Sequence, residues 1–225
     1  MTKYLVSPSI LSGDFADMGS SVKAIERWGG DLVHCDVMDG VYVKNLTFGM
    51  PMIAALRKVT TLPLDVHLMI TEPERYVEEF VKAGADIVTF HVEASKDPLK
   101  TLRKIRSLGC KGGIVFNPDI PFEGYEYLAD ESDMILVMSV YAGKGGQSFI
   151  PETLDKVRAI RNYLTQKGLN VPIEIDGGVN EQNAAACREA GVTVLVAGSS
   201  VYKSDDPART IRILQGLNGS SGQES

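Results

Sequence analysis

The 225-residue sequence lacks the features that mark membrane, secreted and nucleic-acid-binding proteins. No apolar run reaches the roughly 18 residues of a membrane-spanning helix, and the start MTKYLVSPSIL has no long apolar core of a secretion signal. Lysine and arginine total 23 against 29 aspartates and glutamates, and they form no basic stripe. The sequence therefore predicts neither a membrane nor a nucleic acid as a partner.

Cysteine is scarce as well. The chain has three, Cys35, Cys110 and Cys187, an odd number with no CxxC spacing. We therefore expect no structural disulfide and a reducing location, the cytoplasm. Glycine and serine dominate the C-terminal stretch GLNGSSGQES, so we expect residues 218–225 to form a flexible tail.

Short runs of β-branched and apolar residues alternate with amphipathic helical stretches along the chain. We predict strands at residues 4–7, 32–37, 63–69, 86–91, 112–116, 134–139, 172–176 and 193–197, and helices at about 15–28, 50–58, 73–83, 97–108, 121–129, 151–167, 181–190 and 206–217. Eight such units without a break in composition predict a single α/β domain over residues 1–217, a (β/α)8 TIM barrel. An open doubly wound sheet is the alternative, but SPSILSGDF, not GxGxxG, follows the first strand.

The second predicted strand carries the unusual run HCDVMD. Residues two apart in a strand share a face, so His34, Asp36 and Met38 should point to one side and the apolar residues between them to the other. The apolar set suits the interface between barrel and helices. The polar set must then face the barrel axis near the carboxyl end of the strand, where barrels carry their active sites.

Two further strands bring polar groups to the same end. Asp65, His67 and Met69 share one face of the third strand, and Asp176 ends the seventh. Two histidines and two carboxylates then converge, as an N2O2 site for Zn, Mn or Fe(II) would need. The four residues of this predicted site are His34, Asp36, His67 and Asp176. Taken singly, each of these residues is best interpreted as an ordinary polar group of the barrel. Taken together, the four are better explained by a metal site.

Nearby residues admit simpler interpretations. His91 ends the fourth strand and could line the site, but a structural role is favoured. Asp39, in MDG just past a strand, is interpreted as a turn residue rather than as the support of a ligand. Met38, Met69 and Met138 fall near the same strand ends, where they would either exclude water from the site or pack as ordinary core.

Glycine-rich turns follow the last three predicted strands: GKGGQSF at 143–149, DGGVN at 176–180 and AGSS at 197–200. In barrels, the loops after the last strands often hold phosphate with backbone N–H groups. A metal and two carboxylates beside a phosphate pocket suggest chemistry on a small sugar phosphate. The metal would polarise a carbonyl and its neighbouring hydroxyl, and the carboxylates would exchange a proton across the resulting enediolate, which gives an epimer.

Seven motifs in order resemble the ribulose-phosphate 3-epimerase family: SPSILSGDF, HCDVMDG, PLDVHLMI, MSV, GGQSFIPETLDK, EIDGGVN and VAGSSVY. The resemblance runs in register from about residue 5 to residue 202. It implies a (β/α)8 barrel that interconverts D-ribulose 5-phosphate and D-xylulose 5-phosphate with one divalent metal ion per chain, Zn, Fe(II) or Mn. It also implies a homo-oligomer, a dimer or a hexamer, and a place in carbohydrate metabolism such as the pentose phosphate pathway.

The resemblance assigns roles to individual residues. His34, Asp36, His67 and Asp176 are similar to the metal ligands of the family, and Asp36 and Asp176 to its two acid–base residues. The residues similar to its substrate contacts and phosphate cradle are Ser9, His67, Gly143, Gly146, Gly177, Gly178, Gly198 and Ser199. A carboxylate that binds metal through one oxygen could still move a proton with the other.

Two stretches depart from the family pattern. VYVKNLT places Lys44 where the family has proline, and YAGKGGQSF places Tyr141, Ala142 and Lys144 in a loop that usually reads NPGFGGQSF. This loop is the expected lid, so its changes could alter closure or the accepted sugar length. The alternatives are a D-allulose 6-phosphate 3-epimerase, with the same chemistry on a longer sugar, an aldose–ketose isomerase as a rival reaction, and a non-catalytic sugar-phosphate binding protein. The intact aspartate pair argues against the last.

Overall fold

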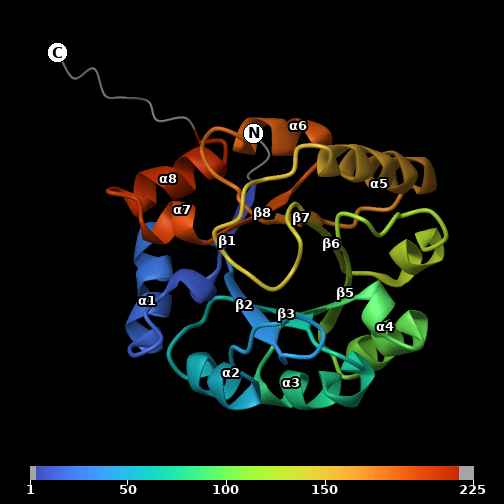
Figure 1. Cartoon of the computed structure of the whole chain (residues 1–225), viewed down its shortest axis with the longest axis horizontal. Coiled ribbons are helices and arrows are strands. Elements are labelled where there is room, and N and C mark those ends of the chain that lie inside the picture. The colour runs from blue at the N-terminus through green and yellow to red at the C-terminus, as the bar shows by residue number, and fades with distance from the viewer. Residues whose placement is uncertain (1–3, 218–225) are drawn as a thin grey trace.

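Eight short parallel strands form a ring that helices surround on the outside, in a computed structural model that describes residues 4–217 (Figure 1). The strands are β1 (Leu5–Pro8), β2 (Val33–Met38), β3 (Leu64–Met69), β4 (Ile87–His91), β5 (Lys111–Phe116), β6 (Met134–Met138), β7 (Ile173–Asp176) and β8 (Val194–Ala197). All eight agree with the strands expected from the sequence to within one residue at each end. The tail expected at 218–225 lies outside the described residues.

The helices fill the connections between the strands. They are α1 (Met18–Trp28), α2 (Met50–Arg57), α3 (Val77–Ala83), α4 (Pro98–Ser107), α5 (Thr153–Lys167), α6 (Ala184–Ala190), α7 (Ser199–Tyr202) and α8 (Pro207–Leu214). Short 3-10 helices are η1 (Ile10–Ser12), η2 (Pro73–Arg75), η3 (Val92–Ala94) and η4 (Glu126–Glu131). Within residues 4–217, no helix has the length and apolar character needed to cross a bilayer.

Parallel pairing continues around the whole ring. The strand order is β1-β8-β7-β6-β5-β4-β3-β2, and an isolated parallel bridge between Ser9 and His34 brings the two end strands together. The predicted (β/α)8 barrel is therefore confirmed. Because parallel strands all end at the same edge, the residues at their carboxyl ends meet at one mouth of the ring.

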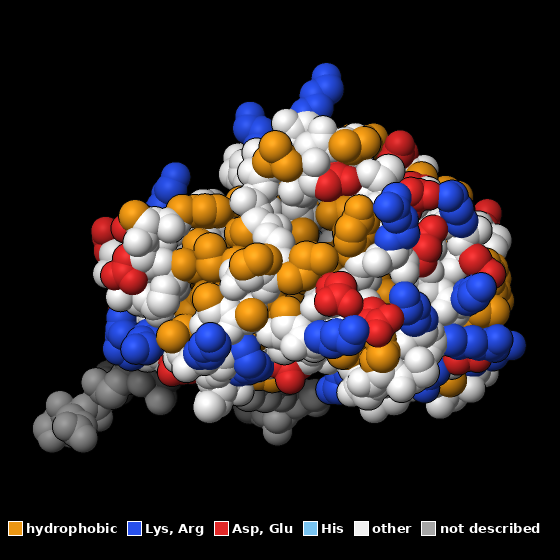
Figure 2. Space-filling model, turned by 90° about the horizontal axis from the view of Figure 1, so that it is seen from below, with side chains coloured by type: hydrophobic (Ala, Val, Ile, Leu, Met, Phe, Trp, Pro, Cys, Tyr) orange, Lys and Arg blue, Asp and Glu red, His pale blue; other side chains and the backbone are white. Residues whose placement is uncertain are grey.

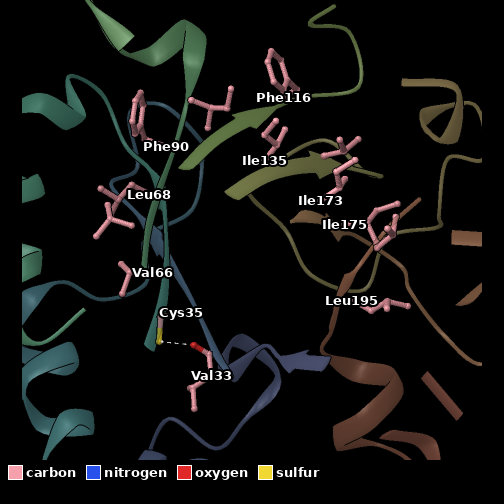
Figure 3. Packing of buried hydrophobic residues seen from close by; sticks show 14 of the residues in the cluster. Val33, Cys35, Val66, Leu68, Phe90, Phe116, Ile135, Ile173, Ile175 and Leu195 are labelled. Carbon is pink, nitrogen blue, oxygen red and sulfur yellow. Dashed lines mark hydrogen bonds between the residues drawn. The ribbon is translucent and has the colours of Figure 1, made fainter. Parts of the chain in front are cut away.

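Strand alternation separates an apolar layer from a polar interior. The outward residues, among them Val33, Cys35 and Phe90, pack into one buried cluster between strands and helices (Figure 3). Inside the ring, Leu32, Ile87, Met134 and Val194 form a separate cluster near the amino ends of the strands. This apolar cluster lies at the opposite end of the ring from the carboxyl ends of the strands. All three cysteines are buried and free, as expected.

One expected helix is wrong. The stretch at 121–129 forms turns followed by the 3-10 helix η4, not an α-helix. Gly124 has a φ of 88°, a left-handed conformation that an α-helix cannot continue through. The structure also adds the short helix α7 directly after β8, where the sequence analysis predicted only the helix that became α8.

Phe90→Ala tests the apolar layer. Phe90 is fully buried on β4, and removing its ring should lower the free energy of unfolding by about 3–5 kcal/mol, since a cavity remains. Urea unfolding followed by circular dichroism measures the change. The control Tyr127→Ala removes a side chain that is 49% exposed and should cost less than about 1 kcal/mol. Equal losses in the two variants would contradict this packing.

Candidate metal and substrate site

A pocket opens at the carboxyl ends of the strands. Its space of about 580 Å³, including the open mouth, suits a small molecule. The expected site residues that line it are Ser9, Asp36, Met38, Met69, Met138, Gly143, Gly146, Asp176, Gly177, Gly178, Gly198 and Ser199. His34 and His67 do not line it, because both are fully buried beneath the two aspartates.

Four predicted ligand residues converge under this pocket. Asp36 Oδ1 lies 3.4 Å from both His34 Nε2 and His67 Nδ1. Asp176 Oδ2 lies 3.9 Å from the first nitrogen and 4.0 Å from the second. The four ligand atoms all lie within 4.8 Å of one another. Neither nitrogen has a hydrogen-bond partner among the described residues, so two buried ring nitrogens face the same point, as the ligands of a divalent metal would.

The two oxygens of Asp36 have different surroundings. The Ser9 hydroxyl donates a hydrogen bond of 2.5 Å to Oδ2, while Oδ1 faces the two imidazoles. Ser9 also accepts a hydrogen bond from the backbone N–H of Leu11 at 3.2 Å. Ser9, expected to contact substrate, therefore also orients the carboxylate and selects the oxygen that is presented to the imidazoles.

The two pocket aspartates differ in their affinity for protons. Burial alone would raise the pKa of Asp36, but His34 and His67 hold it below its usual value. Burial and the neighbouring Asp36 carboxylate raise the pKa of Asp176 to about 7. In the metal-free protein near neutral pH, one carboxyl group is ionised and the other is partly protonated. Such a pair provides one proton acceptor and one proton donor.

Buried carboxyl groups contact Nδ1 of His34, the ring nitrogen that faces away from Asp36 and Asp176. Its Nδ1 lies 2.6 Å from Asp65 Oδ2, which also accepts a hydrogen bond from Ser7 at 3.2 Å. Glu174 Oε1 lies 3.8 Å from the same nitrogen. Burial and the Asp65 charge raise the pKa of Glu174 well above its usual value. A proton on Nδ1 directed at Asp65 leaves Nε2 of His34 for a ligand role.

Asp65 and Glu174 were not predicted as site residues from the sequence. The signal that places them is strand parity, because each lies two residues before a predicted ligand on an inward face. His34, Asp65 and Glu174 also form a second group with metal-ligand geometry. Neither Asp65 nor Glu174 lines the pocket.

Glycines let the loops after β6 and β7 pack closely around the pocket. Gly177 and Gly178 have φ values of 123° and 65°, which favour glycine. A Cβ on Gly177 would meet Val140 at 2.6 Å, and one on Gly178 would meet the backbone nitrogen of Phe149 at the same distance. The loop at 139–152 crosses the middle of the strand ring, in yellow in Figure 1.

The two departures from the family pattern lie in different places. Tyr141 and Lys144 line the pocket, and the side chain of Gln147 donates hydrogen bonds to both of their carbonyls, at 2.8 and 2.7 Å. Lys44 does not line the pocket. Asp39 also lies away from it and holds a turn, since Oδ1 accepts hydrogen bonds from the N–H groups of Val41 and Tyr42, both at 2.8 Å.

Known proteins match the chain over most of its length. The Ribulose-phosphate 3 epimerase family matches residues 5–202. A ribulose-phosphate 3-epimerase of Synechocystis sp. is 49% identical, over 92% of this chain and 91% of its own. The Escherichia coli K12 protein of that name is 46% identical, over 94% of both chains. A chloroplastic ribulose-5-phosphate-3-epimerase of Arabidopsis thaliana is 50% identical, over 92% of this chain and 75% of its own.

Solved structures agree with the barrel fold. A tryptophan synthase α-subunit of Pyrococcus furiosus superimposes with a TM-score of 0.68 at 13% identity, over 96% of this chain and 99% of its own. A thiamine phosphate pyrophosphorylase of the same organism gives 0.63 at 16% identity, over 96% and 97%. At such low identity these similarities show the fold alone.

Metal titration tests the ligand cluster. Burial lowers the pKa of His34, but the Asp65 and Asp36 charges outweigh it and raise the pKa well above its usual value. A proton must therefore leave Nε2 when a metal binds. Calorimetric titration with Zn²⁺ or Mn²⁺ should give one ion per chain, with proton release and weaker binding as the pH falls. Asp36→Asn should weaken binding strongly, and Asp39→Asn, on the adjacent turn, should not; equal effects would contradict the assignment.

Proposed function

The chain belongs to the ribulose-phosphate 3-epimerase family, and from this premise we propose that it interconverts D-ribulose 5-phosphate and D-xylulose 5-phosphate by proton transfer at C3. One observation carries the proposal. Asp36 and Asp176, from the ends of β2 and β7, line a single pocket directly above the paired imidazoles of His34 and His67. Carboxylates so placed can serve a proton transfer that inverts one carbon.

The residues divide the reaction between them. A divalent ion, when bound, would supply Lewis-acid polarisation of the ketose carbonyl and its neighbouring hydroxyl. The ligands would be His34, Asp36, His67 and Asp176. One aspartate removes the C3 proton and the other returns a proton to the opposite face of the planar enediolate. Met38, Met69 and Met138 line the pocket, where they would surround the reacting carbons with apolar surface and exclude water.

The phosphate end of the substrate would lie among the glycine-rich loops. Backbone N–H groups of Gly146, Gly177, Gly178, Gly198 and Ser199 would bind its oxygens. Lys144 adds a charge to this cradle. Among the described residues that line the pocket it is the one lysine or arginine, while both acidic residues there belong to the metal cluster. A phosphate dianion would therefore find its positive partner in Lys144.

The same loop favours one alternative substrate. Tyr141 and Lys144 line the pocket, so a longer sugar such as D-allulose 6-phosphate would contact them as well. The chemistry at C3 would be identical. Relative kcat/KM values for the two sugars decide between the substrates.

We expect the protein to act in the cytoplasm as a homo-oligomer, a dimer or a hexamer. Hydrophobic side chains gather on the face of α2 and α3 (Figure 2). In the loop between β2 and α2, Val41 and Leu46 are 75% and 73% exposed. Apolar surface of this kind favours contact with another protein chain. Light scattering of the purified protein measures the oligomeric state.

Solvent exchange is the direct test of the reaction. Metal-loaded protein in D2O should place deuterium at C3 of D-ribulose 5-phosphate while D-xylulose 5-phosphate accumulates, both visible by NMR. Proton transfer at C3 predicts this result, and deuterium at C1 with an aldose product would indicate aldose–ketose isomerisation. If metal is bound but neither the pentulose nor the hexulose phosphate exchanges deuterium, the protein is a sugar-phosphate binding protein and not an epimerase.

Asp176→Asn tests the acid–base assignment. The amide cannot exchange the proton, so kcat should fall by about 10²–10⁴-fold. Unchanged circular dichroism would show that the fold is retained. Asn180→Ala, a few residues further along the same loop, serves as the comparison and should keep most of the activity. Near-normal turnover of Asp176→Asn would rule out a two-aspartate mechanism.

Lys144→Gln tests the phosphate partner. Loss of the charge should raise KM by about tenfold with little change in kcat, because the interaction is uniform along the reaction. The KM of the parent protein should rise with salt, and that of the variant should rise less. Lys44→Gln, which removes a cation outside the pocket, should leave both constants unchanged. Identical behaviour of the two variants would remove Lys144 from substrate recognition.

A further inference from the structure

His91 is a buried imidazole that the proposed mechanism does not use. It ends β4, is fully buried and does not line the pocket. Its Nε2 lies 3.0 Å from Nε2 of His67, and the two rings are stacked with centroids 5.1 Å apart. His67 thus presents its other nitrogen, Nδ1, to the aspartates, with Asp36 Oδ1 at 3.4 Å. A hydrogen bond between two Nε2 atoms contains one proton. Whether that proton is bonded to His67 or to His91 determines the tautomer of His67.

The carboxylate of Glu93 determines which of the two imidazoles carries that proton. Its Oε1 accepts hydrogen bonds from the Tyr42 hydroxyl at 2.7 Å and from the Asn117 side-chain amide at 2.9 Å. Asn117 in turn accepts a hydrogen bond from the backbone of Ala142 in the loop over the pocket. Two neutral donors thus stabilise the ionised form of Glu93. Glu93 is therefore a fixed carboxylate that can only accept.

His91 Nδ1 faces this carboxylate. Glu93 Oε1 lies 3.6 Å away, just beyond hydrogen-bond distance, and Nδ1 has no hydrogen-bond partner among the described residues. A lone pair directed at the carboxylate would be repelled, so the proton of His91 lies on Nδ1. His91 is fully buried, and burial disfavours a second, charge-bearing proton, so the ring carries a single proton. Its Nε2 is then an acceptor.

The hydrogen bond between His91 Nε2 and His67 Nε2 links the tautomer of His91 to the metal cluster. Since His91 Nε2 accepts, His67 Nε2 must donate, and the single proton of a neutral His67 is used there. The Nδ1 atom of His67 is left with a lone pair, aimed at the point shared with His34 Nε2 and the two aspartates. We propose that His91 and Glu93 are positioning residues that hold His67 in the one tautomer able to bind a divalent metal.

The two imidazoles of the cluster are thus prepared in different ways. His34 meets its carboxylate directly, at Asp65, and presents Nε2. His67 reaches Glu93 through His91 and presents Nδ1. In both cases an acceptor holds a proton on the far nitrogen and turns the near nitrogen toward the cluster. This inference rests on the metal-site part of the proposed function and not on the identity of the sugar.

Nitrogen-15 NMR of the imidazoles tests the proposal without substrate. The chain contains three histidines, all in the described residues, so a histidine-labelled sample gives a spectrum that can be assigned by single substitutions. We expect His67 to carry its proton on Nε2 and His91 on Nδ1, and Zn²⁺ to shift the Nδ1 signal of His67. A proton on Nδ1 of His67 in the metal-free protein would overturn the proposal.

Two variants supply a second readout. His91→Phe keeps an aromatic ring at this position and removes both nitrogens, and Zn²⁺ affinity should fall by roughly 10–100-fold. Glu93→Gln is nearly isosteric and removes only the fixed charge, so affinity should fall by about tenfold and His91 should populate both tautomers. The control is Glu72→Gln, because Glu72 follows the neighbouring strand β3 and pairs with Arg75 and Lys96.

The outcomes separate this proposal from the proposed function. Wild-type Zn²⁺ affinity and an unchanged His67 tautomer in Glu93→Gln would overturn the positioning role. Should His91→Phe fail to fold, the Glu93→Gln result and the wild-type spectrum still decide. A protein with the expected tautomers and affinity losses but without epimerase activity would retain the positioning role and lose only the assigned reaction.

Discussion

The register between β2 and β3 is the constraint on which the site depends. It pairs His34 with Asp65 and Asp36 with His67, so each imidazole lies beside a carboxylate of the adjacent strand. A slip of one residue would turn every polar side chain of a strand toward the helices. The alternation that hides the apolar residues of β2 outside the ring thereby fixes which polar groups meet inside it.

Burying imidazoles and carboxylates is costly unless they are paired, and most of the polar interior serves that pairing. Ser9 holds Asp36, Asp65 holds His34, and Glu93 acts on His67 through His91. Each partner orients a ring or carboxyl group and occupies the atom that faces away from the cluster. The atoms left over point to a single place below the pocket, and this converts structural pairing into a candidate metal site.

Much of this arrangement could be predicted from the sequence. Eight hydrophobic runs indicated the strands, and strand parity placed Asp36 and Asp176 at one mouth, because parallel strands end at the same edge. The 121–129 helix was mispredicted, since Gly124 adopts a left-handed conformation that composition does not reveal. Roles for Asp65 and Glu93 were also missed. Their function follows from distances to imidazoles on other strands, and no local pattern encodes such distances.

The sequence by itself determined the fold, the inward face of each strand and the residues able to bind a metal, because alternation and strand direction are local properties with a global result. Tertiary structure alone decided which oxygen of Asp36 is free, which nitrogen each histidine presents, and that Lys144 rather than Lys44 lines the pocket. These choices depend on contacts between strands and loops far apart in the chain, where a difference of one ångström separates a partner from a neighbour.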